Sequence, residues 1–310
     1  MRRKPEMKNQ PAPPNAIVVG VARPWSAAAL DWAADEAVAT SRPLHLVHVI
    51  EGFDHTPVDL DGDVDGSTAV EVTGVLESHP SLRVTAHTDT GSPAGALVAA
   101  SRTAETLVVG ATAHTLLKAV VLGSVALQVA AHSFCPVVVV HDLEPSDSDA
   151  RAGVRAVSTD PGRVVVGLDA SERSVRALAY AFEQASRRQV GLTAVACWAW
   201  DESDGFLALP VPVWEATREQ QRRLVAELLA GWGEKYPDVD VQTRLEQART
   251  VPTLLEVAVG ASLLVVGTRG RGGFDGLLLG SVSQRVIERA SCPVAVVPAP
   301  DLDPGRRGPR

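Results

Sequence analysis

A glycine-rich segment in the second half of the chain has the residue types that could hold an anion. Six glycines lie between Gly267 and Gly280, and Arg269 and Arg271 stand among them. Glycine allows positive φ and leaves main-chain N–H groups uncovered by a Cβ atom, so such a loop can wrap around a phosphate. Arginine adds charge-assisted hydrogen bonds to phosphate oxygens. The predicted chemistry is phosphate binding.

The spacing of this segment supports the same prediction. It follows an apolar run and has the form Gly-x2-Gly-x9-Gly-Ser, through Gly267, Gly270, Gly280 and Ser281. Gly280 and Ser281 open an amphipathic helical pattern, and a helix N-terminus carries unpaired N–H groups and about half a positive charge. Ser281 and Ser283 could add hydroxyl donors. The P-loop pattern GxxxxGK[ST] is absent, and a surface loop with an N-cap serine remains the alternative.

An internal repeat organises the chain. Three motifs recur 157 residues apart (265 minus 108), and a fourth recurs at 147 (164 minus 17). The pairs are Val108-Val109-Gly110 with Val265-Val266-Gly267, Leu122-Gly123-Ser124 with Leu279-Gly280-Ser281, Cys135-Pro136-Val137 with Cys292-Pro293-Val294, and Ile17-Val18-Val19-Gly20 with Val164-Val165-Val166-Gly167. Ordered self-similarity of this kind indicates a tandem duplication.

Each copy alternates short apolar runs with helical patterns. In the second copy we expect strands at 163–168, 191–198, 239–245, 263–267 and 294–297. Two apolar helical faces are expected at Val175, Leu178, Ala179 and Phe182, and at Val225, Leu228, Leu229 and Trp232. Apolar strands alternating with helices predict an α/β fold of two tandem doubly wound domains, each a five-stranded parallel sheet with helices on both faces.

The repeat also predicts the domain boundaries. We expect a disordered tail at 1–15, a first domain at 16–141, a linker at 142–162, a second domain at 163–298 and a tail at 299–310. Ligands of doubly wound sheets bind beyond the carboxyl ends of the strands, where the strand order reverses. In the second domain the loop beginning at Asp169 and the loop beginning at Gly267 should therefore converge.

The motifs resemble those of the universal stress protein family. The glycine-serine spacing from Gly267 to Ser281 matches the ATP-binding motif of that family, and the Val-Gly-Leu-Asp169 opening and the Cys292-Pro293-Val294 strand are similar too. The resemblance covers both copies, and the arrangement is similar to the tandem members of actinobacteria. It implies a strand order of 3-2-1-4-5 and dimerisation, often through the last strand.

The resemblance also implies a ligand and the residues that hold it. The ligand would be ATP, with or without Mg²⁺, with its adenine near Asp169 and Leu192. Ribose and phosphates would lie on the glycine loop and the helix after it. The residues there are Gly267, Arg269, Gly270, Arg271, Gly280, Ser281, Val282 and Ser283. By their place after the second expected strand of this copy, Trp198 and Trp200 could stack on the base, and core or dimer packing is their alternative role.

The first copy departs from the motif. Ala22 replaces the aspartate, Ala113 replaces the second glycine, and both arginines are lost, so that Gly110, Gly123 and Ser124 are what remains. A Cβ at a position that needs positive φ costs on the order of 1 kcal/mol. Each lost charge-assisted bond costs about 1.5–3 kcal/mol. We expect this degenerate site to bind ATP weakly or not at all.

Three function classes follow from these residues. The first is an ATP-binding regulatory protein of the stress response, because no nucleophile–base pair or metal-ligand cluster lies in the predicted crevice. Its partners would be the nucleotide, a second copy or the other domain of the same chain, and an unidentified regulatory protein. The second is a slow ATPase or another ATP-using enzyme, and the third is a dimeric scaffold that binds no nucleotide.

Composition narrows the remaining possibilities. The net charge of the 310 residues is −8, with 9 Lys and Arg against 18 Asp and Glu in residues 1–150 and 20 against 19 in the rest, which does not favour nucleic-acid binding. No apolar run approaches the ~20 residues of a membrane span, and the N-terminus lacks a secretory signal pattern. Cys135, Cys197 and Cys292 are widely spaced, which is typical of a cytoplasmic protein without a zinc site.

Three further features have predicted roles that involve no catalysis. The acidic segment 59–66 matches the first half of a calcium loop but lacks a Glu at the twelfth position, so both a flexible acidic loop and a weak cation site stay open. Cys135 and Cys292 occupy equivalent positions before the last strand and are expected to be small packed residues. His48 is expected to be a satisfied residue at a strand end.

Overall fold

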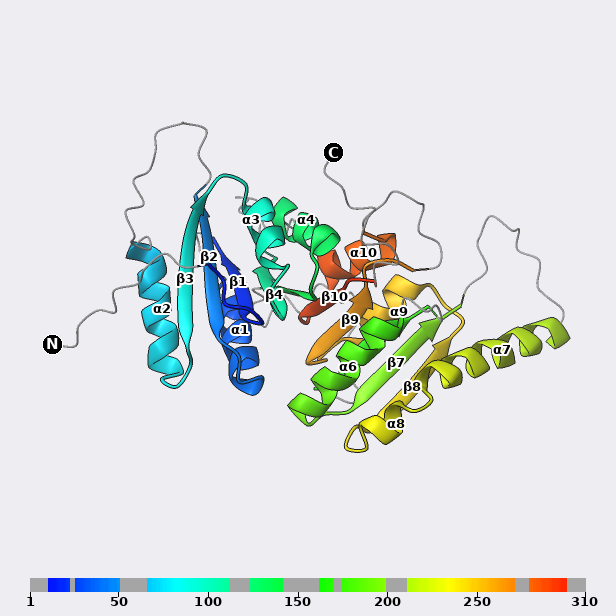
Figure 1. Ribbon diagram of the computed structural model, residues 1–310. Helices are drawn as coiled ribbons and strands as arrows, with labels where there is room; N and C mark the ends of the chain where they lie inside the picture. The colour runs from blue at the N-terminus through cyan, green and yellow to red at the C-terminus, as the bar shows by residue number, and fades with distance from the viewer. Residues whose placement is uncertain are drawn as a thin grey trace. The chain divides into compact units, whose positions relative to one another are not determined.

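The computed structural model describes residues 11–22, 26–50, 66–111, 123–141, 162–169, 174–198, 211–270 and 279–299. The chain divides into two compact units (Figure 1). One comprises Met1–Arg155 and Ile287–Ala295, and the other comprises Ala156–Val286 and Val296–Arg310. By sequence, residues 287–295 belong to the second repeat, so the domain boundaries drawn from the repeat stay a prediction.

The first repeat forms a five-stranded sheet in the order β3-β2-β1-β4-β5, and its neighbouring strands run parallel. The strands are β1 Ile17–Val21, β2 Leu44–Ile50, β3 Val84–Thr90, β4 Thr106–Gly110 and β5 Val137–Val140. The helices are α1 Ala27–Ala39, α2 Gly66–Ser78, α3 Pro93–Ala100 and α4 Ser124–His132. Strands β1, β4 and β5 are almost wholly apolar because both faces of the sheet are buried there, whereas the edge strand β3 is largely polar and half-buried.

Two glycines show that helices cover both faces of this sheet. A Cβ on Gly20 would stand 2.9 Å from Leu97 of α3, whereas a Cβ on Gly110 would meet Ser26 and Ala29 at the start of α1. Gly20 is paired with Val109, and successive strand residues point to opposite faces, so Gly110 faces away from α3. Helix α3 packs beside α4, as the ribbon also shows (Figure 1).

The second repeat has the equivalent strand order, β8-β7-β6-β9-β10. Its strands are β6 Val164–Leu168, β7 Leu192–Cys197, β8 Val241–Glu246, β9 Leu263–Gly267 and β10 Val294–Val297. Its helices are α6 Ser174–Arg188, α7 Val211–Leu229, α8 Trp232–Lys235, α9 Thr250–Val257 and α10 Ser281–Arg289. Each predicted strand is found, with its ends shifted by at most two residues. The predicted fold class, a doubly wound α/β fold with the order 3-2-1-4-5, is confirmed.

Both predicted helical faces need correction. In α6, Val175 is 40% exposed, and the buried stripe runs instead through Ala177, Leu178 and Phe182. Leu178 and Phe182 are buried as predicted, whereas Val175 is not and Ala179 is half-buried, because small and polar residues share the buried side of the helix and give a weak apolar signal. The second face does not lie on one helix, since α7 ends at Leu229 and α8 begins at Trp232, which stacks on Phe182 at 5.2 Å between ring centroids.

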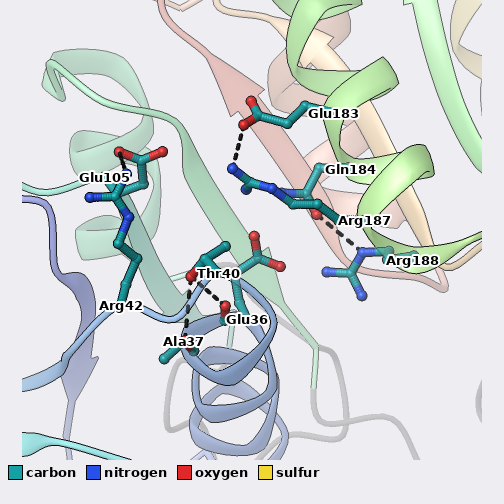
Figure 2. Close-up of polar contacts among 9 residues, drawn as sticks. All are labelled: Glu36, Ala37, Thr40, Arg42, Glu105, Glu183, Gln184, Arg187 and Arg188. Atoms are coloured by element: carbon teal, nitrogen blue, oxygen red, sulfur yellow. Dashed lines mark hydrogen bonds and ion pairs between the residues drawn. The ribbon is translucent and has the colours of Figure 1, made fainter. Parts of the chain in front are cut away.

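Polar side chains at equivalent positions form hydrogen bonds at the carboxyl ends of α1 and α6 (Figure 2). Thr40 Oγ1 donates to the Glu36 carbonyl at 2.7 Å, and just beyond the helix Arg42 pairs with Glu105 at 3.7 Å. In α6, Arg188 Nε donates to Gln184 Oε1 at 3.1 Å. Glu36 and Gln184 are both buried and lie 148 positions apart (184 minus 36), as do the apolar residues of the two stripes.

A buried arginine links the amino ends of three neighbouring strands, β6, β7 and β8, in the second repeat. Arg163 Nη1 pairs with Asp240 Oδ2 at 2.7 Å, and its other guanidinium nitrogens donate to Thr193 Oγ1 at 3.1 Å and to the Leu192 carbonyl at 2.8 Å. A Cβ on Gly191 would lie 2.2 Å from Nη1. Position 191 therefore has room for glycine and for nothing larger while this guanidinium keeps its place.

Candidate functional site

The two loops predicted to converge are in contact. Asp169 follows the last residue of β6, and Gly270 lies three residues beyond the end of β9. A Cβ built on Gly270 would stand 2.9 Å from Asp169 Oδ2 and 3.7 Å from its Cγ. These residues lie at the carboxyl ends of two central strands, β6 and β9, which are neighbours in the sheet. This edge is the switch point, where doubly wound folds bind ligands.

The carboxylate of Asp169 is held from its own side of the crevice by Ser174. The Ser174 hydroxyl donates to Asp169 Oδ1, and the same Oγ accepts from the Asp169 main-chain N–H at 3.3 Å. Ser174 is buried and is the first residue of α6. The half-buried aspartate thus has one oxygen tied to the helix and the other directed toward Gly270.

The base of the glycine loop is closed by hydrogen bonds. The Gly280 N–H donates to the Thr268 carbonyl at 2.7 Å, and the Ser283 hydroxyl donates to the Gly267 carbonyl at 2.6 Å. The Gly280 carbonyl accepts from Gln284 at 3.0 Å, which begins the hydrogen bonding of α10. Residues 271–278, with Arg271 among them, lie outside the described residues.

Gly270 and Gly280 are required for close approach of neighbouring atoms and not for positive φ. Among the described glycines, positive φ occurs at Gly91, Gly162, Gly231 and Gly260, and no motif glycine is one of them. The expected strain from positive φ is therefore wrong for the described motif positions. Close approach replaces it, because a Cβ on Gly270 would crowd Asp169. A Cβ on Gly280 would stand 3.3 Å from the Thr268 carbonyl.

The remaining assigned residues lie around the closed base. Ser281 is exposed at the first position of α10, Val282 and Arg269 are half-buried, and Ser283 is buried. The Ser283 hydroxyl donates its proton to the Gly267 carbonyl. Ser283 therefore stabilises the base of the loop and does not offer that proton to a ligand.

Leu192, which was expected to line the adenine pocket, lies away from this site. It begins β7 and pairs with Val164, the first residue of β6, at the end of the sheet opposite to Asp169. It is also wholly buried. Beside the last residue of β6 stands Ala196, and Trp198 follows β7 with its N–H on the Glu246 carbonyl at 3.0 Å. Trp198, expected near the base, thus lies at the Asp169 end of the sheet, whereas Ala196 was not expected there, and Trp200 lies outside the described residues.

In its described residues, the first repeat keeps the hydrogen bond at the base of the glycine segment, and its sequence lacks the aspartate and the serine that make side-chain contacts in the second repeat. Gly123 caps α4 before Ser124, and its N–H donates to the Ala111 carbonyl at 3.3 Å. A Cβ on Gly110 would stand 2.7 Å from the Cβ of Ser26, the N-cap of α1. Ala126 stands where the second repeat has Ser283 (283 minus 157). The contact of Ser26 with Gly110 and the replacement of Ser283 by Ala126 were not predicted from the sequence.

The other predicted roles divide into tested and untested. Cys135 and Cys292 are buried and form no disulfide, and burial raises the pKa of the Cys135 thiol to about 12, so the packed role is confirmed. His48 Nδ1 lies 3.1 Å from the Val21 carbonyl, as expected of a satisfied strand-end residue. The acidic segment 59–66 lies outside the described residues except for Gly66.

In the described part of the chain, no group of three or more His, Cys, Asp and Glu side chains is placed to hold a metal ion, and no helix is long and apolar enough to cross a membrane. The fold and the contact of the two loops thus define a two-repeat, doubly wound α/β protein with a candidate ligand site at the switch point of its second repeat.

Comparison with known proteins gives the family. The model of the universal stress protein family matches residues 15–141 and 161–298. A universal stress protein of Mycolicibacterium smegmatis is 38% identical over 303 residues, which are 93% of this chain and 98% of the relative. One of Mycobacterium tuberculosis is 34% identical over 304 residues, again 93% and 98%. The chain belongs to the universal stress protein family, as its motifs predicted.

Solved structures agree with the fold. The crystal structure of a universal stress protein from Archaeoglobus fulgidus matches with a TM-score of 0.58 and 19% identity, over 91% of this chain and 98% of that one. At this identity the likeness supports the architecture alone.

Proposed function

We propose that the second repeat, as a domain spanning 163–298, binds ATP, and that the protein is a cytoplasmic regulator that reports nucleotide occupancy in the stress response. The observation that carries the proposal is the contact between Asp169 and Gly270 at the switch point, above a glycine loop whose base is closed. A carboxylate beside an exposed main chain suits a ligand that has hydrogen-bond donors at one end and phosphates at the other.

Each part of the site has a role in this proposal. The main-chain N–H groups at the start of α10 and the charge of Arg269 attract the phosphates, and Asp169 accepts from the adenosine part. Arg271 is a second cation of the same loop by sequence. Mg²⁺, if it accompanies ATP, would neutralise phosphate charge. The ordering of the loop around ATP would then be read by a partner protein or by a second copy.

Regulation is preferred to catalysis because the residues described at the crevice offer one carboxylate and no neighbouring base. Slow hydrolysis is the alternative, and incubation of the purified protein with excess ATP separates the two. Several turnovers within minutes would favour an ATPase, whereas bound and unchanged ATP supports the proposal.

The test of the ligand is mass spectrometry of what the purified, full-length protein releases on denaturation, together with calorimetric titration with ATP. We expect adenine nucleotide in near one-to-one amount. Ser281→Ala, which removes a hydroxyl at the exposed helix start, should weaken ATP binding about threefold to tenfold.

The matched control is Ser124→Ala, the same change at the start of α4 in the first repeat. It should leave the affinity for ATP unaltered. Absence of adenine nucleotide from the released material, with no heat on titration, would instead favour the scaffold that binds no nucleotide.

A further inference from the structure

We propose that Ser174 is a positioning residue of the nucleotide site, one that sets the orientation of the Asp169 carboxylate. The inference rests on the proposed function and adds a residue to it that does not itself touch the ligand.

The geometry at Asp169 supports this role. Ser174 Oγ both donates to Oδ1 of Asp169 and accepts from its main-chain N–H, so one hydroxyl fixes the side chain and the main chain of the same residue. With Oδ1 held, the carboxylate plane places Oδ2 against Gly270. Because Ser174 is buried and begins α6, this arrangement is anchored to a helix rather than to a loop.

The first repeat provides an internal comparison. Ser26 is the equivalent of Ser174, 148 positions earlier (174 minus 26), but Ala22 stands where the second repeat has Asp169. Without that carboxylate, the Ser26 hydroxyl accepts from the Ala29 N–H at 3.2 Å and caps α1. The same residue type at the same position thus serves the aspartate in one copy and the helix in the other.

A second replacement accompanies the first. The position of Gly270 is occupied in the first repeat by Ala113, outside the described residues, so the copy without the aspartate is also the copy that has a Cβ there. A held carboxylate and a bare main chain occur together in the second repeat. Neither occurs in the first.

The chemical consequence follows from the carboxylate. Its oxygens only accept hydrogen bonds, so it can select the donors of the adenosine part, such as an amino group or a ribose hydroxyl, and it repels phosphate. When Ser174 is lost, the side chain of Asp169 gains rotamer freedom, and contact with adenosine becomes weaker. Contact between the phosphates and the glycine loop does not depend on that hydroxyl.

The experiment uses the full-length protein and two ligands, ATP and inorganic tripolyphosphate, in calorimetric titrations. Ser174→Ala should weaken ATP binding about tenfold and leave tripolyphosphate binding within twofold of the parent. Ser174→Thr, which keeps a hydroxyl, should restore most of the affinity. In an Asp169→Ala background, Ser174→Ala should cause no further loss, because the serine acts through the aspartate.

The matched control is Ser26→Ala, which removes the equivalent hydroxyl and should leave ATP binding unchanged. Equal losses for ATP and tripolyphosphate, a full additional loss in the Asp169→Ala background, or unaltered binding by Ser174→Ala would each overturn the inference while leaving ATP binding by the parent intact. A parent protein that binds no ATP would remove the proposed function itself.

Discussion

At the scale of single residues, Gly270 and Asp169 show how one position constrains another that is distant in the chain. The glycine was expected for its conformational freedom, yet the structure requires it for room, since a Cβ would stand 2.9 Å from a carboxylate oxygen that cannot easily move away. The need for glycine is therefore conditional on the aspartate. In the first repeat both residues are replaced by alanine, the aspartate by Ala22 and the glycine by Ala113.

This dependence can be measured as a coupling energy. Gly270→Ala should destabilise the folded protein by about 1 kcal/mol, because the new Cβ displaces a held carboxylate. In an Asp169→Ala background the same change should be nearly neutral, which gives a coupling of about 1 kcal/mol in urea unfolding. The control is Gly267→Ala, whose Cβ, among the described residues, would meet the Arg269 carbonyl at 3.5 Å, an ordinary contact. Equal cost in both backgrounds would contradict the explanation.

At the scale of elements, parallel strands bring side chains from distant segments onto one face of the sheet. His45 on β2 is buried, with Nδ1 2.8 Å from Thr85 Oγ1 on β3, and His87 lies two residues further along β3. Burial, and then the charge of His87, lower the pKa of His45 to about 4 from the ordinary value of 6.5. The second repeat has Thr193 in the equivalent place beside Arg163, so this histidine belongs to one copy only.

Stability should consequently fall in acid through His45. Above pH 6.5 the folded and unfolded chains both hold a neutral imidazole. Between pH 6.5 and about 4 the unfolded chain takes up a proton that the folded chain does not, so the free energy of unfolding decreases, by at most about 3.4 kcal/mol, and then levels off. His45→Gln should show a weaker decrease over this range in urea unfolding. Carboxylates titrate alike in both proteins and cancel, so equal slopes would refute the role of His45.

At the scale of the whole molecule, two copies of one architecture carry different chemistry at the same edge of their sheets. The strand orders are equivalent. In each copy the glycine segment leads into a helix, α4 in the first and α10 in the second, whose first turn is capped or hydrogen-bonded by the last glycine. The second copy adds a held carboxylate and a hydroxyl that closes the loop base through Ser283. The first copy has Ala22 and Ala126 there, and Ser26 stands against Gly110.

The stoichiometry of binding should reflect this asymmetry. Titration of the full-length protein should show one ATP per chain at high affinity, with any binding to the first repeat weaker by about two orders of magnitude or more. Asp169→Ala should reduce the high-affinity phase, whereas Ser124→Ala should not. Two equivalents of ATP bound with similar affinity would contradict the assignment of the first site as degenerate.

Much of the protein could be read from its amino acids alone. Recurring motifs revealed the duplication, apolar runs located the second repeat's strands to within two residues, and the family was confirmed by comparison. These features are local: a strand or a glycine motif is specified by residues that are neighbours in the chain. The predicted helical face was wrong at Val175, which is exposed, and the structure places Leu192 at the end of β7 that lies away from Asp169.

Only the tertiary structure decided which distant groups meet. The hydroxyl of Ser174 on Asp169, the carboxylate against Gly270, and the hydroxyl of Ser283 on the Gly267 carbonyl each join separate elements. Such contacts depend on the pairing of the strands and on how the helices lie across the sheet, and no periodicity in the chain encodes an interatomic distance. A residue type can be written in the sequence, but the space around it is set by what folding brings beside it.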